Sequence, residues 1–225
     1  MRPILWEVDA QADFMLPGGK LYVPGAEKII PYIHRLVDQA RQSRVVLISS
    51  ADAHQPDDPE FREWLPHCVK GTPGAELIPE ARATRLLVIP NQHDFILPSE
   101  LSADQQFLIE KNTLDVFDNP NTDKLLTHLS SSKEPNTKRS LDVLVFGVVT
   151  EHCVLRAADG ILRRGHLVSI VEDAIQSLDD KKGREILCDL HSRGAQLVTT
   201  ERALALIASD ALHSAEGQLR KTAGS

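Results

Sequence analysis

The feature that most constrains the fold is a regular alternation of short apolar runs with segments of helical periodicity. Several of the apolar runs consist almost entirely of valine, isoleucine and leucine, which is typical of strands covered on both faces. The predicted strands are residues 4–8, 45–48, 86–89, 141–148, 167–171 and 197–198. The predicted helices between and after them are residues 26–43, 122–129, 151–164, 179–193 and 201–208.

This alternation predicts a single-domain α/β fold, doubly wound, with a six-stranded, mostly parallel sheet and helices on both faces. We expect the domain to span residues 1–210 and residues 211–225 to form a C-terminal tail. Ligands of such sheets bind beyond the carboxyl ends of the strands. The residues that follow the predicted strands are therefore the first candidates for a functional site.

Composition narrows the classes of function. The 225 residues carry a formal net charge of −7, which disfavours a general nucleic-acid binder. No apolar stretch approaches the ~20 residues that a membrane-spanning helix needs, and the first residues lack the apolar region of a secretion signal. Three scattered cysteines are too few for a disulfide framework. We expect a reduced, cytoplasmic protein whose partner is a small molecule, with no nucleic acid or membrane partner; homo-oligomerisation is left open.

Chemically reactive side chains follow three of the predicted strands. Asp9 follows the first strand, Asp52 and His54 follow the second, and Cys153 follows the strand 141–148. Parallel strands end at the same edge of a sheet, so this edge is expected to collect a carboxylate, an Asp-x-His pair and a thiol.

Cys153 stands where a helix is expected to begin. With Thr150 as N-cap, its sulfur would lie near the positive end of the helix dipole, which favours the nucleophilic thiolate. The alternative is a small buried apolar residue, a common role for free cysteines. Asp9 and Asp13 are both candidates for the base that such a nucleophile needs, although each could instead cap a helix or form a turn.

Asp52 and His54 are two positions apart, so along an extended segment their side chains point to one side. Carboxylate oxygen and imidazole nitrogen suit Zn²⁺ or another divalent transition ion. His67 could supply a third ligand and Glu60 a fourth. The alternative is a solvated histidine in a polar loop.

Together these segments resemble the isochorismatase-like cysteine hydrolases, and within them the nicotinamidase branch. The resemblance is spread over most of the chain, and the segment WLPHCVKGTPGAEL is its most specific part. The matching segments, in family order, are VDAQADF (8–14), GGKLYVPGAEKIIP (18–31), SSADAH (49–54), WLPHCVKGTPGAEL (64–77), EKNTLDVF (110–117) and GVVTEHC (147–153).

The resemblance implies a catalytic triad of Asp9, Lys111 and Cys153, which selects Asp9 over Asp13 as the acid–base residue. It also implies an oxyanion hole formed by the backbone N–H groups of Val149 and Cys153, with a cis peptide bond before Val149.

For the metal, the resemblance implies Asp52, His54 and His67 as ligands. Glu60 occupies the position at which some nicotinamidases place a fourth ligand, a histidine. The implied ion is a divalent metal, with Zn²⁺ first and Fe²⁺ or Mn²⁺ as alternatives.

The substrate pocket implied by the resemblance includes Phe14 and Trp64, and His152 could line it as well. The implied reaction is hydrolysis of nicotinamide to nicotinate and ammonia. Two alternatives stay open: another small amide, carbamoyl or ureido substrate for the same cysteine chemistry, or a non-catalytic binding module of the same fold.

Overall fold

The computed structural model describes residues 3–101, 105–131 and 139–210. The proposed tail at 211–225 lies outside these residues. Within them, all strand pairs of the main sheet are parallel, and the strand order is β3-β4-β2-β1-β5-β6-β7. The strands are β1 (Pro3–Val8), β2 (Val46–Asp52), β3 (Arg85–Ile89), β4 (Gln105–Lys111), β5 (Asp142–Val148), β6 (Leu167–Gln176) and β7 (Gln196–Val198).

The parallel α/β fold is confirmed, but the prediction of six strands was wrong by one. The missing strand, β4, pairs with both β2 and β3. Its sequence QQFLIEK has only a short apolar centre, because the buried side chains of Gln106 and Lys111 are polar. Both find hydrogen-bond or ion-pair partners inside the protein, which allows a polar sequence to occupy the interior of a sheet.

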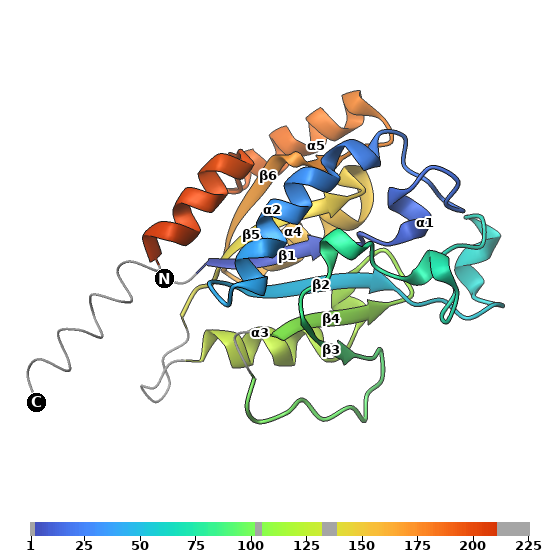
Figure 1. Cartoon of the computed structure of the whole chain (residues 1–225), viewed down its shortest axis with the longest axis horizontal. Coiled ribbons are helices and arrows are strands. Elements are labelled where there is room, and N and C mark those ends of the chain that lie inside the picture. Colours follow the sequence, from blue (N-terminus) through green and yellow to red (C-terminus); the bar gives the residue numbers. More distant parts are fainter. Residues whose placement is uncertain (1–2, 102–104, 132–138, 211–225) are drawn as a thin grey trace, which may run out of the picture.

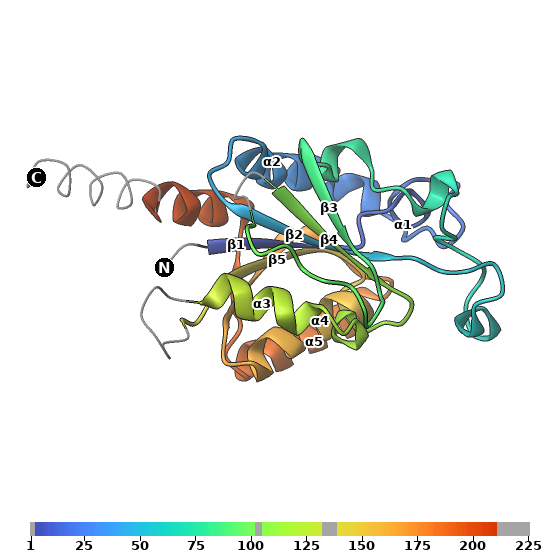
Figure 2. The ribbon, with the colours of Figure 1, turned by 90° about the horizontal axis from the view of Figure 1, so that it is seen from below.

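Helices cover the sheet on both faces (Figures 1 and 2). One face carries α2 (Ile30–Arg41) and the helix at 200–210; the other carries α3 (Thr122–Ser130), α4 (Leu155–Arg163) and α5 (Asp180–Ser192). Short helical segments complete the fold: α1 (Ala12–Met15), η1 (Ala26–Ile29), η2 (Pro59–Arg62), η3 (Pro73–Ala75), η4 (Pro79–Ala81), η5 (Val116–Asp118) and η6 (Thr150–Val154).

Each helical layer buries one side of the central strands. Leu5 and Leu144 pack against the α2 side, whereas Trp6 and Val145 pack against the side of α3, α4 and α5. All four side chains are fully buried. Burying an apolar side chain of this size contributes about 1.5–3 kcal/mol, so the alternation along β1 and β5 fixes the register of the sheet centre.

Strand β1 lies at the centre of the sheet, and the side on which successive strands are added changes there. Strands β2, β3 and β4 lie on one side of β1, whereas β5, β6 and β7 lie on the other side. Such a switch point opens a crevice at the carboxyl ends of the two strands. Asp9 follows β1 and Cys153 follows β5, so the fold brings both to this crevice. No helix in the described part of the chain is long and apolar enough to cross a membrane.

Candidate active site

Four neighbouring strands deliver the central side chains of the site. Asp52 and Lys111 are the last residues of β2 and β4, and they face each other in the parallel register. Asp9 comes directly after β1 and adopts a left-handed backbone conformation, with φ of 52°. Cys153 lies in the helical turn that follows β5. Asp9, Asp52 and Cys153 therefore lie together at the carboxyl edge of the sheet, as predicted.

Lys111 connects the acid and the thiol. Its Nζ lies 2.9 Å from Asp9 Oδ2 and 3.5 Å from Cys153 Sγ, and it also forms an ion pair with Asp52. The second oxygen of Asp9 accepts a hydrogen bond of 2.7 Å from the Ser50 hydroxyl. Asp9 and Lys111 are each 1% exposed, so water does not screen these charges.

The charge states follow from burial and from these contacts. Burial opposes the ammonium form of Lys111, but the carboxylates of Asp52 and Asp9 outweigh it and raise the pKa of Lys111 well above its usual value. Burial also raises the pKa of Asp9, although Lys111 acts in the opposite direction. The pair therefore offers a fixed cation beside a carboxyl group whose proton affinity is increased, which suits proton transfer.

The place of Cys153 near a helix start, which by itself favours the thiolate, does not decide the charge state of this residue. Burial, reinforced by the negative charge of Asp9, raises the pKa of Cys153 well above its usual value, against the opposing effect of Lys111. Its position near a helix start does not overcome this desolvation, because the thiol is buried next to a carboxylate. The thiol needs a base before it can attack, and the Asp9 carboxyl group is its hydrogen-bonding neighbour.

The backbone around Cys153 also differs from a regular helix start. Thr150–Val154 forms a π-helical turn that leads into α4, and Val149, not Thr150, takes the N-cap position. The peptide bond between Val148 and Val149 is cis, as the sequence resemblance implied. Val149 and Cys153 both line the pocket described below.

The candidate metal site lies on the other side of Asp52. Ligand atoms of Asp52, His54 and His67 all lie within 4.8 Å of one another, and all three residues are buried. His67 Nε2 is 3.4 Å and His54 Nε2 is 3.7 Å from Asp52 Oδ2. One carboxylate oxygen and two imidazole nitrogens form a donor set that suits Zn²⁺ or a related divalent ion.

Neighbouring groups orient both imidazoles toward a shared point. Asp58 Oδ2 lies 3.1 Å from His54 Nδ1, and the carbonyl oxygen of Leu65 lies 2.7 Å from His67 Nδ1. These contacts leave the Nε2 atoms for coordination. His54 Nε2 is buried and has no hydrogen-bond partner among the described residues. A polar atom buried in this way is costly without a partner, so the three residues fit a bound cation.

Glu60 lies on the pocket wall, outside the group of three close ligand atoms. Burial raises the pKa of Glu60, and the charge of Asp52 adds to this effect.

The ring of Phe61, the next residue, packs against both candidate ligand histidines. Its centroid lies 5.1 Å from that of His54 and 5.7 Å from that of His67.

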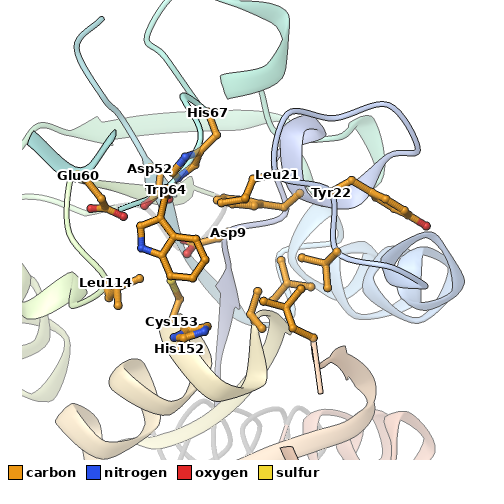
Figure 3. A pocket seen from close by; sticks show the side chains of 15 residues that line it. Asp9, Leu21, Tyr22, Asp52, Glu60, Trp64, His67, Leu114, His152 and Cys153 are labelled. Carbon is orange, nitrogen blue, oxygen red and sulfur yellow. Dashed lines mark ion pairs between the residues drawn. The ribbon is translucent and has the colours of Figure 1, made fainter. Parts of the chain in front are cut away.

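A single pocket joins the two groups. It encloses about 510 Å³ of empty space including its open mouth, and Asp9, Cys153, Asp52 and His67 all border it. Figure 3 shows Trp64 across the middle of the pocket, with Asp52 and His67 beyond one side of the indole and Cys153 and His152 beyond the other. The remaining lining is mostly apolar: Phe14, Leu21, Tyr22, Val23, Leu114, Val148, Val149 and Leu178.

Most candidates from the sequence line this pocket, whereas Lys111 and His54 lie behind its lining, Lys111 in contact with Asp9 and Cys153 and His54 beside Asp52. Phe14, Trp64 and His152 line the pocket, and the Trp64 and His152 rings meet edge-on with centroids 5.5 Å apart. Asp13 has a different place: its carboxylate accepts hydrogen bonds from the backbone N–H groups of Lys20 (3.0 Å) and Cys68 (2.8 Å). Asp13 therefore ties two pocket loops together instead of facing the thiol.

Sequence reasoning missed Ser50 and Asp58, which orient Asp9 and His54. Asp58 lies four residues after His54, and a carboxylate near a candidate ligand histidine was the available signal. Ser50 is two residues before Asp52 on β2, so the two side chains point to the same face of the strand. This spacing could have indicated that Ser50 contacts the site. Leu21 and Leu178 gave no such signal, because they reach the pocket from loops.

Comparison with known proteins gives one family and several full-length relatives. The sequence model of the isochorismatase domain family matches residues 4–88 and 85–202 of this chain. The nicotinamidase/pyrazinamidase of Mycobacterium tuberculosis is 27% identical over 199 residues, covering 85% of this chain and 95% of that protein.

Two solved structures are also similar. The pyrazinamidase of Pyrococcus horikoshii in complex with zinc is 26% identical, with a TM-score of 0.67, covering 88% of this chain and 99% of that one. The N-carbamoylsarcosine amidase of Thermoplasma acidophilum is 25% identical, also with a TM-score of 0.67. The match covers 89% of this chain and 97% of that one.

Proposed function

The chain belongs to the isochorismatase family, and from this premise we propose that it is a cysteine-dependent, metal-assisted amidohydrolase whose preferred substrate is nicotinamide. The observation that carries the proposal is that Asp9 and Cys153, joined by Lys111, border the same pocket as Asp52 and His67 of the candidate metal site. Relatives named as nicotinamidases support the choice of substrate.

In the proposed reaction, Asp9 takes the proton of the Cys153 thiol, and the sulfur attacks the carboxamide carbon of the substrate. Lys111 stabilises the negative charges that develop beside it. The backbone N–H groups of Val149 and Cys153 hold the oxygen of the tetrahedral intermediate, and such donors each contribute about 3–4 kcal/mol in comparable sites. Asp9 then gives its proton to the leaving amine, releasing ammonia. Water hydrolyses the thioester, frees nicotinate and restores the thiol.

Asp52, His54 and His67 would hold the divalent metal, with Glu60 as a further candidate ligand. When bound, the metal supplies a coordination position for the pyridine nitrogen and so orients the ring. The protein's own contribution is the apolar slot: Phe14 and Trp64 offer ring surface for stacking. His152, edge-on to Trp64, lines the same pocket as the thiol.

A second candidate keeps the same cysteine chemistry and changes the substrate to a small carbamoyl, ureido or other amide. The similarity to the N-carbamoylsarcosine amidase favours it. A non-catalytic binding module is the weaker alternative, because Asp9, Lys111 and Cys153 are all present and in contact.

Ammonia release from a panel of amides, measured with and without a chelator, tests the proposal. The panel should contain nicotinamide, pyrazinamide, an N-carbamoyl amino acid and an aliphatic amide. We expect nicotinamide and pyrazinamide to be cleaved fastest and the chelator to slow both. Rapid cleavage of only the carbamoyl or aliphatic compound would transfer the assignment to the second candidate. No ammonia from any amide would favour the binding module.

A further inference from the structure

A second buried carboxyl group lies on β1, just before the residues that carry the catalytic centre. Glu7 is two residues before Asp9 and is fully buried. Its Oε1 accepts a hydrogen bond of 2.7 Å from the backbone N–H of Ala10, the residue that follows Asp9. Its other oxygen, Oε2, has no assigned hydrogen-bond partner among the described residues. The proposed mechanism gives this group no role, yet a carboxyl group is rarely buried without one.

Glu7 is connected to a chain of buried polar groups that crosses the sheet. Its strand partner is Ser49 of β2, and the Ser49 hydroxyl lies near enough to the Glu7 carboxyl group to lower its pKa. Ser49 Oγ in turn accepts a bond of 2.7 Å from Gln106 Nε2 of β4. The Gln106 side chain also bonds the backbone at Ala81 and Ala83. Glu7 therefore lies beside a buried polar network that extends from Ser49 of β2 to Gln106 of β4.

The turn that Glu7 contacts is the one that presents Asp9. Asp9 has a φ of 52°, a left-handed conformation that a non-glycine residue adopts at an energetic cost. The backbone holds Asp9 through its own N–H, which bonds Ser50 O at 3.1 Å, and through its carbonyl, which accepts from Gln11 N at 2.8 Å. The third contact is the bond from Ala10 N to Glu7. Ala10 is fully buried, so its N–H would lose its partner if Glu7 had no acceptor.

We propose that Glu7 is a positioning residue for Asp9: by accepting the Ala10 N–H, it holds the left-handed turn that points the Asp9 carboxyl group at Lys111 and Cys153. The inference rests on the proposed role of Asp9 as the base for the thiol. Glu7 itself touches neither the thiol nor the pocket. Its effect is transmitted through one peptide unit, because the orientation of the Asp9–Ala10 peptide sets the direction of the Asp9 side chain.

The charge of Glu7 supports this role. The pKa of Glu7 is raised to about 8, mainly by burial and to a smaller extent by the negative charge of Asp9, with the contacts of Ser49 and Ala10 opposing the rise. Near neutral pH the carboxyl group is therefore uncharged and does not repel Asp9. Glutamine has the same shape, keeps the carbonyl acceptor for Ala10 and carries no charge, which makes Glu7→Gln the conservative replacement.

The test compares Glu7→Met, which has nearly the same length but no oxygen acceptor, with Glu7→Gln. Leu5→Ala is the matched control, because Leu5 is fully buried two residues earlier on the same strand and its apolar side chain cannot hydrogen-bond to the Asp9 turn. Three properties are measured for each variant: kcat and KM for the best substrate of the amide panel, melting temperature, and the pH-dependent rate at which iodoacetamide alkylates Cys153. All variants carry Cys188→Ser, since Cys188 is exposed and would react as well.

We expect Glu7→Met to lower kcat at least tenfold with KM within threefold, and to lower the alkylation rate of Cys153 at least fivefold with a shifted pH profile. Glu7→Gln should restore both rates to within threefold of the parent. Leu5→Ala should lower the melting temperature and leave both rates within threefold.

Equal losses of rate in Glu7→Met and Leu5→Ala at similar melting temperatures would overturn the proposal, as would a Glu7→Gln variant as slow as Glu7→Met. Should Glu7→Met fail to fold, the comparison of Glu7→Gln with Glu7→Leu decides by the same criteria. Should both acceptor-free variants fail to fold while Glu7→Gln behaves as the parent, Glu7 is a folding residue and the positioning role is rejected. The alkylation rate needs no substrate, so it tests the positioning of Asp9 even if nicotinamide proves to be the wrong amide.

Discussion

Lys111 and Cys153 are 42 residues apart in the sequence, and the fold places Lys111 Nζ 3.5 Å from Cys153 Sγ. Both residues are buried, and Asp9 contacts the same ammonium group at 2.9 Å. The lysine stays charged because two carboxylates surround it, whereas the thiol stays protonated because it is buried beside one of them. In the proposed reaction, nucleophilic attack therefore depends on removal of this proton by Asp9.

Replacing the nucleophile should separate chemistry from folding. Cys153→Ala should abolish ammonia release while leaving the melting temperature and the metal content nearly unchanged, because the residue contributes a small buried side chain and no metal contact. Steady-state kinetics, thermal unfolding and elemental analysis check the three parts. Activity within tenfold of the parent protein would refute the assignment of Cys153.

The two nearby aspartates should respond differently. Asp9→Asn should reduce kcat almost as strongly as loss of the thiol, because an amide cannot accept the thiol proton. Asp13→Asn should act mainly on stability, since Asp13 holds the backbone N–H groups of Lys20 and Cys68; losing one such partner costs about 1–3 kcal/mol. Kinetics and chemical denaturation of both variants distinguish the roles. A reversed order of kcat values would show that the wrong aspartate has been assigned.

Metal content should depend on the two imidazoles. A divalent transition ion, Zn²⁺ first, should copurify near one per chain and be lost from His54→Ala and His67→Ala. The matched control is His34→Ala, because His34 is an exposed residue on α2. Elemental analysis of the purified proteins gives the answer directly. Equal metal content in all variants, or none in the parent protein, would remove the metal from the proposed site.

Glu60→Ala refines the same measurement. Glu60 lies outside the group of three close ligand atoms, so we expect weaker retention of the metal and not its loss.

Substrate choice should depend on a ring nitrogen. Nicotinamide and benzamide have nearly the same size and shape, but benzamide has no atom that could coordinate a metal. Losing that bond in a buried site should cost a few kcal/mol, roughly a hundredfold or more in kcat/KM. We expect nicotinamide to exceed benzamide by this factor, and the ratio to shrink when the metal is stripped. Equal kcat/KM values for the two amides would contradict coordination of the ring.

The buried Glu7 should make stability depend on pH. Its pKa is about 8 in the folded protein, above its usual value of 4.5, because burial disfavours the charged form. Its contribution to stability is fully present below pH 4.5 and is lost as the pH rises through 8. The free energy of unfolding of the parent protein should therefore fall relative to Glu7→Gln by up to about 1.4 kcal/mol per pH unit across this range. Urea denaturation at pH 5.5, 6.5 and 7.5 measures the difference; parallel curves would contradict a buried, titrating Glu7.

The sequence by itself determined the parallel α/β class, because strands buried on both faces must be almost wholly apolar and helices between them must be amphipathic. It also located the residues after β1, β2 and β5, since parallel strands end at one edge whatever the details of packing. The motif around His67 added a candidate ligand that no periodicity could provide, and the structure places it beside Asp52 and His54.

Only the tertiary structure decided which polar residues could be buried. Strand β4 was not recognisable, because Gln106 and Lys111 become tolerable inside a sheet only when partners from distant segments satisfy them. The protonated state of Cys153 was likewise decided by the burial and charge around it, which outweigh its place near a helix start. Local sequence fixes backbone preference and apolar pattern, whereas the surroundings of a buried charge are set by segments far apart in the chain.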